Sequence, residues 1–250
     1  MRLNGKVALV TGAGGGFGEG IARRFAAEGA RVVVADLRRD AAERVAAELG
    51  GDAVAIGGDV SQGADVRAMV EAAVGRFGGL DVVVNNAGTT HRNRPMLEVD
   101  EETFDRVYAV NVKSLYWMAQ AAVPVLRRQG RGGSIINIGS TAGIRPRPGL
   151  VWYNGTKGAV NVMTMCMATE LAPDNIRVNS VCPVIGATGL VAEFMGAPDT
   201  PENRACFRAS IPLGRMSTPE DIANACVWLA EDSSSFITGV LLPVDGGRCA

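Results

Sequence analysis

The fold follows from one stretch, Lys6-Val7-Ala8-Leu9-Val10-Thr11-Gly12-Ala13-Gly14-Gly15-Gly16-Phe17-Gly18, in which a short apolar run leads into a glycine-rich turn. A continuous apolar run of this length is typical of a strand that is buried on both faces. A helical pattern follows and stops at Gly29, and a second apolar run, 32–35, ends at Asp36. This order predicts a strand–helix–strand unit of about thirty residues.

The same alternation continues along the rest of the chain. Apolar runs predict strands at 53–57, 81–84, 134–138, 176–181 and 240–244, and helical patterns predict helices at 40–49, 64–77, 101–128, 152–171 and 219–230. Strands that alternate with helices predict an α/β fold with a parallel sheet covered on both sides. With 250 residues, 47% of them hydrophobic, the chain can bury one sizeable core, so we expect a single domain over 1–250.

Residues that suit a binding site follow directly after the predicted strands. Asp36, Asp59, Asn85, Ser140 and Pro183 all lie at or just past the carboxyl end of a strand. Each of them alone could be a turn or cap residue. Because ligands of open α/β sheets bind along this edge, their shared position predicts a ligand site there.

The glycine-rich turn has the context that dinucleotide binding requires, since it follows a strand, opens a helix and precedes an acidic residue. Glycines let the backbone approach a pyrophosphate, and the start of the helix offers N–H donors. The carboxylate of Asp36 can accept hydrogen bonds from both ribose hydroxyls of NAD and would repel the 2′-phosphate of NADP. Arg38 and Arg39 could turn toward such a phosphate. We therefore expect NAD, with NADP as the weaker alternative.

Tyr153 and Lys157 lie four residues apart and would share one face of a helix. A free phenol has a pKa near ~10 and exchanges protons poorly at neutral pH. A neighbouring ammonium and a bound nicotinamide cation should both lower that pKa. A shift from about 10 to about 7 needs roughly 4 kcal/mol. This pair predicts a tyrosine that acts as the acid and base of a reaction.

With these motifs in the order and spacing observed, the chain resembles the short-chain dehydrogenase/reductase family over essentially its whole length. The matching stretches are Thr11-Gly12-x-x-x-Gly16-x-Gly18, Asp59-Val60, Asn85-Asn86-Ala87-Gly88, Asn111, Ser140, Tyr153-x-x-x-Lys157, Ile237-Thr238-Gly239 and Asp245-Gly246-Gly247. The resemblance implies a Rossmann-type, doubly wound, parallel seven-stranded sheet with helices on both faces. It also implies an alcohol dehydrogenase or ketoreductase, which transfers a hydride between NAD(H) and a ketone or secondary alcohol.

The resemblance assigns the chemistry to Asn111, Ser140, Tyr153 and Lys157. Tyr153 would exchange the proton with the substrate oxygen, and Ser140 would hydrogen-bond the same oxygen. Lys157 would also hold the nicotinamide ribose, and Asn111 would hold a water that connects Lys157 to solvent. The implied cofactor-binding residues are Gly12, Gly16, Phe17, Gly18, Asp36, Leu37, Asp59, Val60, Asn86, Ala87, Gly88, Tyr153, Lys157, Pro183, Gly186 and Thr188. One departure is Val184, where the family often has glycine, and it leaves the backbone path at the pocket floor open.

The composition speaks against several other classes of protein. The net charge of -1 gives no basic surface for nucleic acid, and no apolar run approaches the ~20 residues of a membrane span. The five Cys form no C-x-x-C pair and there is one His, so we expect neither a metal site nor a disulfide framework. That histidine, His91, is expected in a surface loop, and Ser140 does not lie in the G-x-S-x-G elbow of a hydrolase. We expect a soluble, cytoplasmic protein that binds neither nucleic acid nor membrane.

A loop-rich insert over 184–212 carries several Gly and Pro around an apolar set, Leu190, Phe194, Met195 and Phe207. Long inserts of this kind are typically active-site lids, and the apolar set favours a partly hydrophobic small-molecule substrate. Four arginines lie in the loops that flank the predicted pocket: Arg92, Arg94, Arg145 and Arg147. They are either solvated loop charges or attract an anionic substrate.

The predicted helix 152–171 and the stretch 107–126 are apolar nearly all round. A sheet covers only one face of each helix, so the other faces need another partner. We therefore expect a homo-oligomer in which these helices pack across a two-fold axis, and the family resemblance favours a homotetramer.

Two alternatives to the main interpretation stay open. One is a 3-oxoacyl thioester reductase that uses NADPH. Within the main interpretation, a sugar or cyclic-alcohol dehydrogenase also remains open. The other is a catalytically idle dinucleotide-binding protein that serves as a redox sensor or scaffold. The presence of Ser140, Tyr153 and Lys157 argues against the idle protein, because such a relative would be free to lose them.

Overall fold

A seven-stranded sheet lies at the centre of the computed structural model, which describes residues 1–186 and 189–250. The strands are β1 Val7–Thr11, β2 Arg31–Asp36, β3 Ala53–Gly57, β4 Val82–Asn85, β5 Gly133–Ile138, β6 Ile176–Pro183 and β7 Leu241–Val244. They lie in the order β3-β2-β1-β4-β5-β6-β7, and every neighbouring pair is parallel. The predicted parallel α/β sheet is confirmed, with strand ends that differ by at most two residues.

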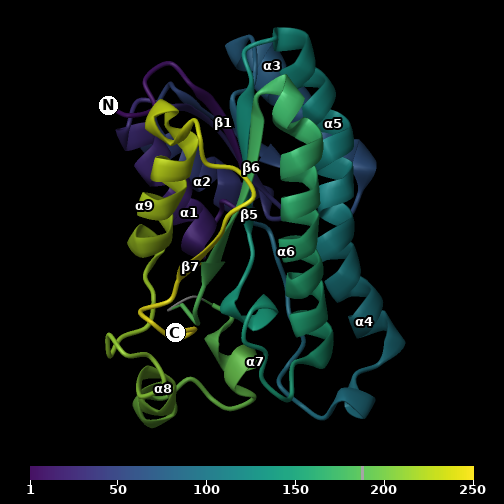
Figure 1. The fold of residues 1–250 in the computed structure, drawn as a ribbon, viewed down its shortest axis with the longest axis vertical. Helices are drawn as coiled ribbons and strands as arrows, with labels where there is room; N and C mark the ends of the chain where they lie inside the picture. The colour runs from purple at the N-terminus through teal and green to yellow at the C-terminus, as the bar shows by residue number, and fades with distance from the viewer. Residues whose placement is uncertain (187–188) are drawn as a thin grey trace.

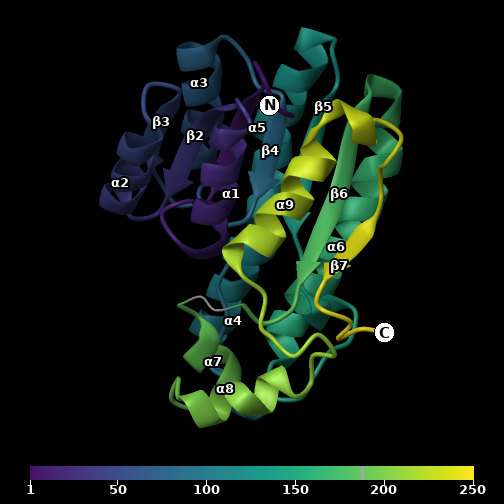
Figure 2. The ribbon, with the colours of Figure 1, turned by 90° about the vertical axis from the view of Figure 1, so that its left-hand side faces the viewer.

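Helices cover both faces of the sheet. They are α1 Gly16–Ala27, α2 Arg39–Leu49, α3 Gly63–Phe77, α4 Glu101–Tyr108, α5 Ser114–Gln129, α6 Val151–Leu171, α7 Val191–Met195, α8 Pro201–Arg208 and α9 Pro219–Ala230. Figure 1 shows the sheet separating α1, α2 and α9 from α3, α5 and α6. In Figure 2 the short helices α7 and α8 lie below the carboxyl ends of the strands. Among the described helices, none combines the length and the apolar character needed to cross a membrane.

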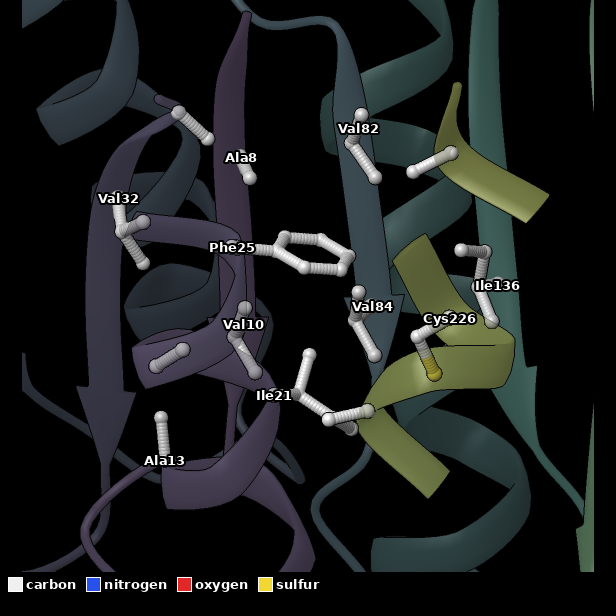
Figure 3. Packing of buried hydrophobic residues seen from close by; sticks show 14 of the residues in the cluster. Ala8, Val10, Ala13, Ile21, Phe25, Val32, Val82, Val84, Ile136 and Cys226 are labelled. Atoms are coloured by element: carbon white, nitrogen blue, oxygen red, sulfur yellow. The ribbon is translucent and has the colours of Figure 1, made fainter. Parts of the chain in front are cut away.

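Strand β1 explains why the apolar run of the sequence is continuous. Ala8 and Val10 pack with Ile21 and Phe25 of α1 on one face of the sheet, as Figure 3 shows. The intervening residues Val7 and Leu9 pack on the other face, in the cluster formed with α3, α5 and α6. Both faces of β1 are buried, and each large apolar side chain that is fully buried contributes about 1.5–3 kcal/mol to the free energy of unfolding.

The order of the strands reverses between β1 and β4, because the chain builds outward first on one side of β1 and then on the other. Such a switch point leaves a crevice at the carboxyl ends of the strands. The hydroxyl of Thr11 accepts hydrogen bonds from the backbone N–H groups of Asn86 and Ala87, both at 3.1 Å. This single side chain holds together the two strand ends that border the crevice.

The predicted helix 101–128 differs from the structure in one respect. Its α4 and α5 parts are joined by a π-helical turn, Ala109–Lys113, which contains the buried residue Asn111. A π turn holds one extra residue, and the apolar periodicity of the sequence does not reveal it. The insert also contains the two helices α7 and α8, where the sequence favoured loop.

Candidate active site

The carboxyl ends of β1, β2, β4, β5 and β6 open into one cavity of about 650 Å³. The lining at one end comes from the glycine-rich turn with Asp36 and Arg38, and the middle from Asn86, Ala87 and Gly88. The lining at the other end includes Ser140, Tyr153 and Lys157, together with the insert. The cavity therefore joins the residues expected to bind a dinucleotide to those expected to carry the chemistry.

The glycine-rich turn is built for close backbone approach. Gly12 has a φ of +63°, and a Cβ there would lie 2.9 Å from the Cα of Ala87. A Cβ at Gly18 would overlap the carbonyl oxygen of Gly12. Helix α1 begins at Gly16, and its N-cap residue is Gly15, which has no side chain that could accept hydrogen bonds from the first turn. The first N–H groups of α1 are thus available to an anion, and the turn fits a pyrophosphate.

Asp36 is held in place at the end of β2. Its two carboxylate oxygens accept hydrogen bonds from the backbone N–H groups of Gly14, at 2.8 Å, and of Arg38, at 2.9 Å. A carboxylate has about four lone-pair positions, so two ribose hydroxyls can still donate to it. The side chain of Arg38 lies mostly in solvent, with Nε 3.9 Å from Asp36 Oδ1.

Of the other residues expected to bind the cofactor, Phe17, Pro183 and Gly186 line the cavity. Gly18 lies within the glycine-rich turn, packed against the amide of Asn86. Thr188 lies outside the described residues.

Three more of those expected residues lie away from the described lining of the cavity. Leu37 is 71% exposed to solvent, and Val60 belongs to the buried core. Asp59 organises its own loop, where its carboxylate accepts a hydrogen bond from the N–H of Ser61 at 2.8 Å. These residues border the crevice at the end of β3 or next to β2, beyond the space that the cavity encloses.

Three of the four residues predicted to be catalytic, Ser140, Tyr153 and Lys157, line the same cavity. Ser140 follows β5, and its hydroxyl accepts a hydrogen bond from the N–H of Ala142 at 3.1 Å. Tyr153 and Lys157 are on the first two turns of α6 and are buried. The Lys157 ammonium donates to the carbonyl oxygen of Ile138 at 2.8 Å and lies 5.9 Å from the centre of the Tyr153 ring.

The expected lowering of the tyrosine pKa by Lys157 does not occur among the residues of this chain. Burial has the largest effect and raises the pKa of Tyr153 to about 12, while the Ser140 hydroxyl and the charge of Arg147 act in the opposite direction. Burial removes the phenolate from water, and the sequence argument left this cost out. The ammonium of Lys157 is engaged with the Ile138 carbonyl instead. The nearby cation that favours the phenolate is therefore Arg147.

Burial of the Lys157 ammonium lowers the free energy of unfolding, because it lowers the pKa of this side chain from 10.5 to about 8. Below pH 8 the side chain is charged in both the folded and the unfolded protein, and folding removes that charge from water. Lys157→Met should therefore raise the free energy of unfolding at pH 7 by up to ~3 kcal/mol, less the value of the bond to Ile138. The gain should shrink as the pH rises from 8 to 10.5, where the unfolded lysine also loses its proton.

Denaturant unfolding of both proteins at pH 7 and at alkaline pH measures this difference. Lys113→Met removes an exposed lysine and should show no such pH dependence. A Lys157→Met protein that is less stable at pH 7, or whose gain is the same at every pH, would contradict the prediction.

Asn111 connects the loop after β4 to helix α6. Its side-chain oxygen accepts from the N–H of Thr89, and its amide donates to the carbonyl of Thr89 and the hydroxyl of Thr156. A Cβ placed on Gly88 would lie 3.5 Å from the Asn111 oxygen and 3.8 Å from the Lys157 nitrogen. Both polar groups thus border the same small space, and one lone pair of the Asn111 oxygen stays available for a water.

The insert packs directly over the tyrosine. The ring of Phe194 in α7 lies 5.1 Å from the ring of Tyr153, in an edge-to-face arrangement. Arg147 donates to the carbonyl of Phe194 at 2.5 Å and lies over the ring of Phe207 at 4.9 Å. Val184, which departs from the family pattern, is buried, lines the cavity and donates its N–H to the carbonyl of Val244 at 3.4 Å. The backbone at the pocket floor therefore runs on beside β7.

The arginines expected near the pocket divide into two groups. Arg145 and Arg147 line the cavity, whereas Arg92 and Arg94 line a separate depression around His91. The cavity also contains Arg248, which the sequence analysis missed. Its position just after the Asp245-Gly246-Gly247 motif was the available signal, because the last parallel strand ends at the same edge as the others.

The expectation that His91 is a surface residue is wrong. The side chain is 2% exposed, its Nδ1 is 2.9 Å from the carbonyl oxygen of Arg92, and its Nε2 has no hydrogen-bond partner among the described residues. Polar neighbours in the sequence suggested a solvated loop, but the fold encloses this side chain. No cluster of His, Cys, Asp and Glu in the described part of the chain could hold a metal ion.

Known proteins resemble this chain along nearly its whole length. Residues 12–248 match a family model described as enoyl-(acyl carrier protein) reductase. The chain is 53% identical over 251 residues to 4-formylbenzenesulfonate dehydrogenase of Comamonas testosteroni, and the match covers 99% of each protein. It is 41% identical over 249 residues to 2,5-dichloro-2,5-cyclohexadiene-1,4-diol dehydrogenase of Sphingobium indicum, with 98% of this chain and 97% of that protein covered.

A solved structure also resembles this chain along its whole length. The crystal structure of 3-ketoacyl-(acyl-carrier-protein) reductase from Brucella melitensis, complexed with NADH, has a TM-score of 0.95 to this chain at 48% identity. The match covers 99% of this chain and 100% of that one. The Rossmann-type architecture inferred from the sequence is thereby confirmed.

Proposed function

The chain belongs to the short-chain dehydrogenase/reductase family of oxidoreductases, and from this premise we propose that it transfers a hydride between NAD(H) and a ketone or secondary alcohol. The observation that carries the proposal is the single cavity lined both by Gly12, Gly16 and Asp36 and by Ser140 and Tyr153. We take residues 1–250 as one catalytic domain, with 184–212 as its substrate lid.

A nicotinamide cofactor, once bound, would supply or accept the hydride, and the residues of this chain would transfer the proton. During reduction Tyr153 donates its proton to the carbonyl oxygen, and during oxidation it accepts the proton of the alcohol. The hydroxyl of Ser140 donates a hydrogen bond to the same oxygen and stabilises the charge that develops there. Lys157, fixed by the Ile138 carbonyl and close to Asn111, holds the ribose side of the cofactor and passes protons toward solvent.

NAD is the proposed cofactor because of the position of Asp36. Its carboxylate lines the cavity, is anchored by two backbone N–H groups and would repel the 2′-phosphate of NADP. The match to a structure complexed with NADH supports this choice. Gly12, Gly16 and the N-terminus of α1 would hold the pyrophosphate, and Asn86 to Gly88 would line the ribose.

A ring-bearing substrate agrees best with the walls of the cavity, where Leu190, Phe194 and Phe207 provide apolar surface. The two dehydrogenases described above, at 53% and 41% identity, are named for ring compounds, whereas a meso-2,3-butanediol dehydrogenase at 39% identity is named for an acyclic diol. A second candidate is a 3-oxoacyl thioester, because the matching structure is named as a 3-ketoacyl-(acyl-carrier-protein) reductase.

The test is to follow the absorbance of NADH and of NADPH with aryl ketones, cyclic ketones, aldehydes and acetoacetyl thioesters. The proposal expects turnover of at least one ring-bearing carbonyl compound, faster with NADH. Turnover of thioesters alone would favour the second candidate. NADH binding without turnover of any compound would instead favour the idle dinucleotide-binding protein.

The homotetramer expected from the sequence is also a proposal, as is a cytoplasmic location. Helices α5 and α6 cover the same face of the sheet (Figure 1) and leave Tyr116, Val162 and Met165 exposed. Sedimentation should give the mass of four protomers, and Val162→Glu should shift it to a smaller assembly. Val74→Glu, a similar change on α3, should leave the mass unchanged. A wild-type protein that sediments as a monomer would contradict this.

A further inference from the structure

Arg147 is the best-positioned cation of the substrate end of the cavity. Its guanidinium carries five N–H donors, and within the described residues it makes one hydrogen bond, to the carbonyl oxygen of Phe194. The ring of Phe207 supports one face of the guanidinium at 4.9 Å. The side chain is thus held in a defined position while most of its donors remain available to a ligand.

No acidic side chain of the described protein neutralises this arginine. The ion pairs found among the described residues involve other arginines and Lys6, and Asp36 is the one acidic residue in the described lining of the cavity. Burial and the nearby charge of Arg248 both lower the pKa of Arg147. A partly buried cation beside a second cation is costly until an anion joins them.

Arg145 and Arg248 complete a cluster of positive charge. Arg145 donates to the backbone carbonyl of Arg248 at 2.7 Å, which ties the loop after β5 to the segment after β7. Both side chains line the cavity with Arg147. We call Arg145, Arg147 and Arg248 the arginine cluster. A planar guanidinium fork matches the two oxygens of a carboxylate or sulfonate.

The arginine cluster lies close to the reacting end of the cavity. Phe194 joins the two, because its ring contacts the Tyr153 ring at 5.1 Å and its carbonyl accepts from Arg147 at 2.5 Å. The glycine-rich turn, which suits the cofactor pyrophosphate, contributes another part of the lining. A substrate with its carbonyl at Tyr153 would lay an apolar body along Phe194 and Leu190 and place its far substituent near Arg147.

We propose that the arginine cluster, with Arg147 as the main contact, binds an anionic substituent of the substrate and selects ring-bearing carbonyl compounds or alcohols that carry a carboxylate or sulfonate. This inference rests on the proposed oxidoreductase function and names the substrate class of the same site. The anion fills the positive end of the cavity, and the apolar wall holds the ring between it and the reacting carbon.

The first experiment compares matched substrates with the wild-type enzyme and NADH. 4-Acetylbenzoate carries the anion, and 4-acetylbenzamide has nearly the same shape without the charge. The expected kcat/KM is at least about 10-fold higher for 4-acetylbenzoate, and this preference should fall as salt is added, because salt screens the attraction. Equal kcat/KM values for the two compounds at low salt would overturn the proposal.

The second experiment uses Arg147→Gln. Its kcat/KM for 4-acetylbenzoate should fall about 10- to 100-fold further than its kcat/KM for 4-acetylbenzamide, mostly through KM. Any effect of the lost charge on the Tyr153 phenol lowers kcat for both substrates alike, so the ratio of the two values isolates anion binding. Arg147→Lys should retain part of the preference. Arg208→Gln removes the same charge from the exposed side of the neighbouring helix α8, outside the lining, and should change neither value. Equal losses on both substrates would show that Arg147 only supports the lid.

Two further measurements keep the result clear. If Arg147→Gln does not fold, Arg248→Gln replaces it. This variant should show a smaller fall in kcat/KM, again larger for 4-acetylbenzoate than for 4-acetylbenzamide. Calorimetric titration with benzoate, in the presence of NADH, reports anion binding without turnover. Binding that is lost in the arginine variant, with no ketone reduced by the wild type, would reject the proposed function and retain the anion site. Turnover that ignores charge would reject the anion site alone.

Discussion

Tyr153→Phe should lower kcat for carbonyl reduction by about 10²- to 10⁴-fold, the contribution typical of a positioned proton donor. The substitution removes one oxygen and keeps the ring, so the contact with Phe194 at 5.1 Å and the shape of the cavity should persist. With its pKa raised to about 12, the phenol stays protonated across the neutral range and is ready to donate. Initial rates with NADH and the best ketone of the panel give the measurement.

The control for this variant is Tyr116→Phe, which removes the same oxygen from an exposed tyrosine on α5. It should keep the wild-type rate. The Kd for NADH, measured by fluorescence titration, should remain within about 3-fold of wild type in Tyr153→Phe. This measurement is needed because weaker cofactor binding could also lower the rate. A Tyr153→Phe enzyme that retains a third or more of the wild-type kcat would remove the tyrosine from the mechanism.

Asp36→Ser should change the choice of cofactor by about 10²- to 10³-fold, measured as the ratio of kcat/KM with NADH to kcat/KM with NADPH. Losing two hydrogen bonds from ribose hydroxyls to a charged acceptor weakens NADH by roughly 10- to 100-fold. Removing the carboxylate also ends its repulsion of a 2′-phosphate, worth about another factor of ten. Arg38, whose Nε lies 3.9 Å from Asp36 Oδ1, then becomes available to the phosphate.

Two variants make the cofactor experiment specific. Asp40→Ser removes an exposed carboxylate from the first turn of α2 and should leave the ratio unchanged. Combining Asp36→Ser with Arg38→Ala should lose part of the gain with NADPH. If Asp36→Ser weakens both cofactors equally, the carboxylate supports the glycine-rich turn through Gly14 and does not select between them.

The sequence predicted the features that local chemistry determines. The residues from Val7 to Val10 are all apolar, which predicted a strand buried on both faces, and all four are fully buried in the structure. Gly18 belonged to the predicted glycine-rich stretch, and the structure places it in the first turn of α1, where a Cβ would overlap the carbonyl oxygen of Gly12. Parallel strands also bring their carboxyl ends to one edge, so the topology predicted that Asp36 and Ser140 would line the same cavity.

The features that were missed depend on contacts between distant segments. His91 is buried although its neighbours in the sequence are polar, and Arg248 lines the cavity because the last strand lies beside β6. The pKa of Tyr153 rises because the fold removes the phenol from water, which spacing along one helix does not reveal. The π turn at Asn111 is a fourth case, because the sequence analysis treated 101–128 as one regular helix.

The insert between β6 and α9 contributes nothing to the two buried clusters that hold the sheet and its helices together: among the described residues, neither cluster has a member between 182 and 221. Substitutions at the exposed positions of this segment should therefore leave the packing of both clusters intact while they reshape the cavity wall, whereas Val191 and Ile211 are themselves buried. Replacing this segment with that of a relative should therefore change the range of substrates while the sheet and its covering helices stay the same.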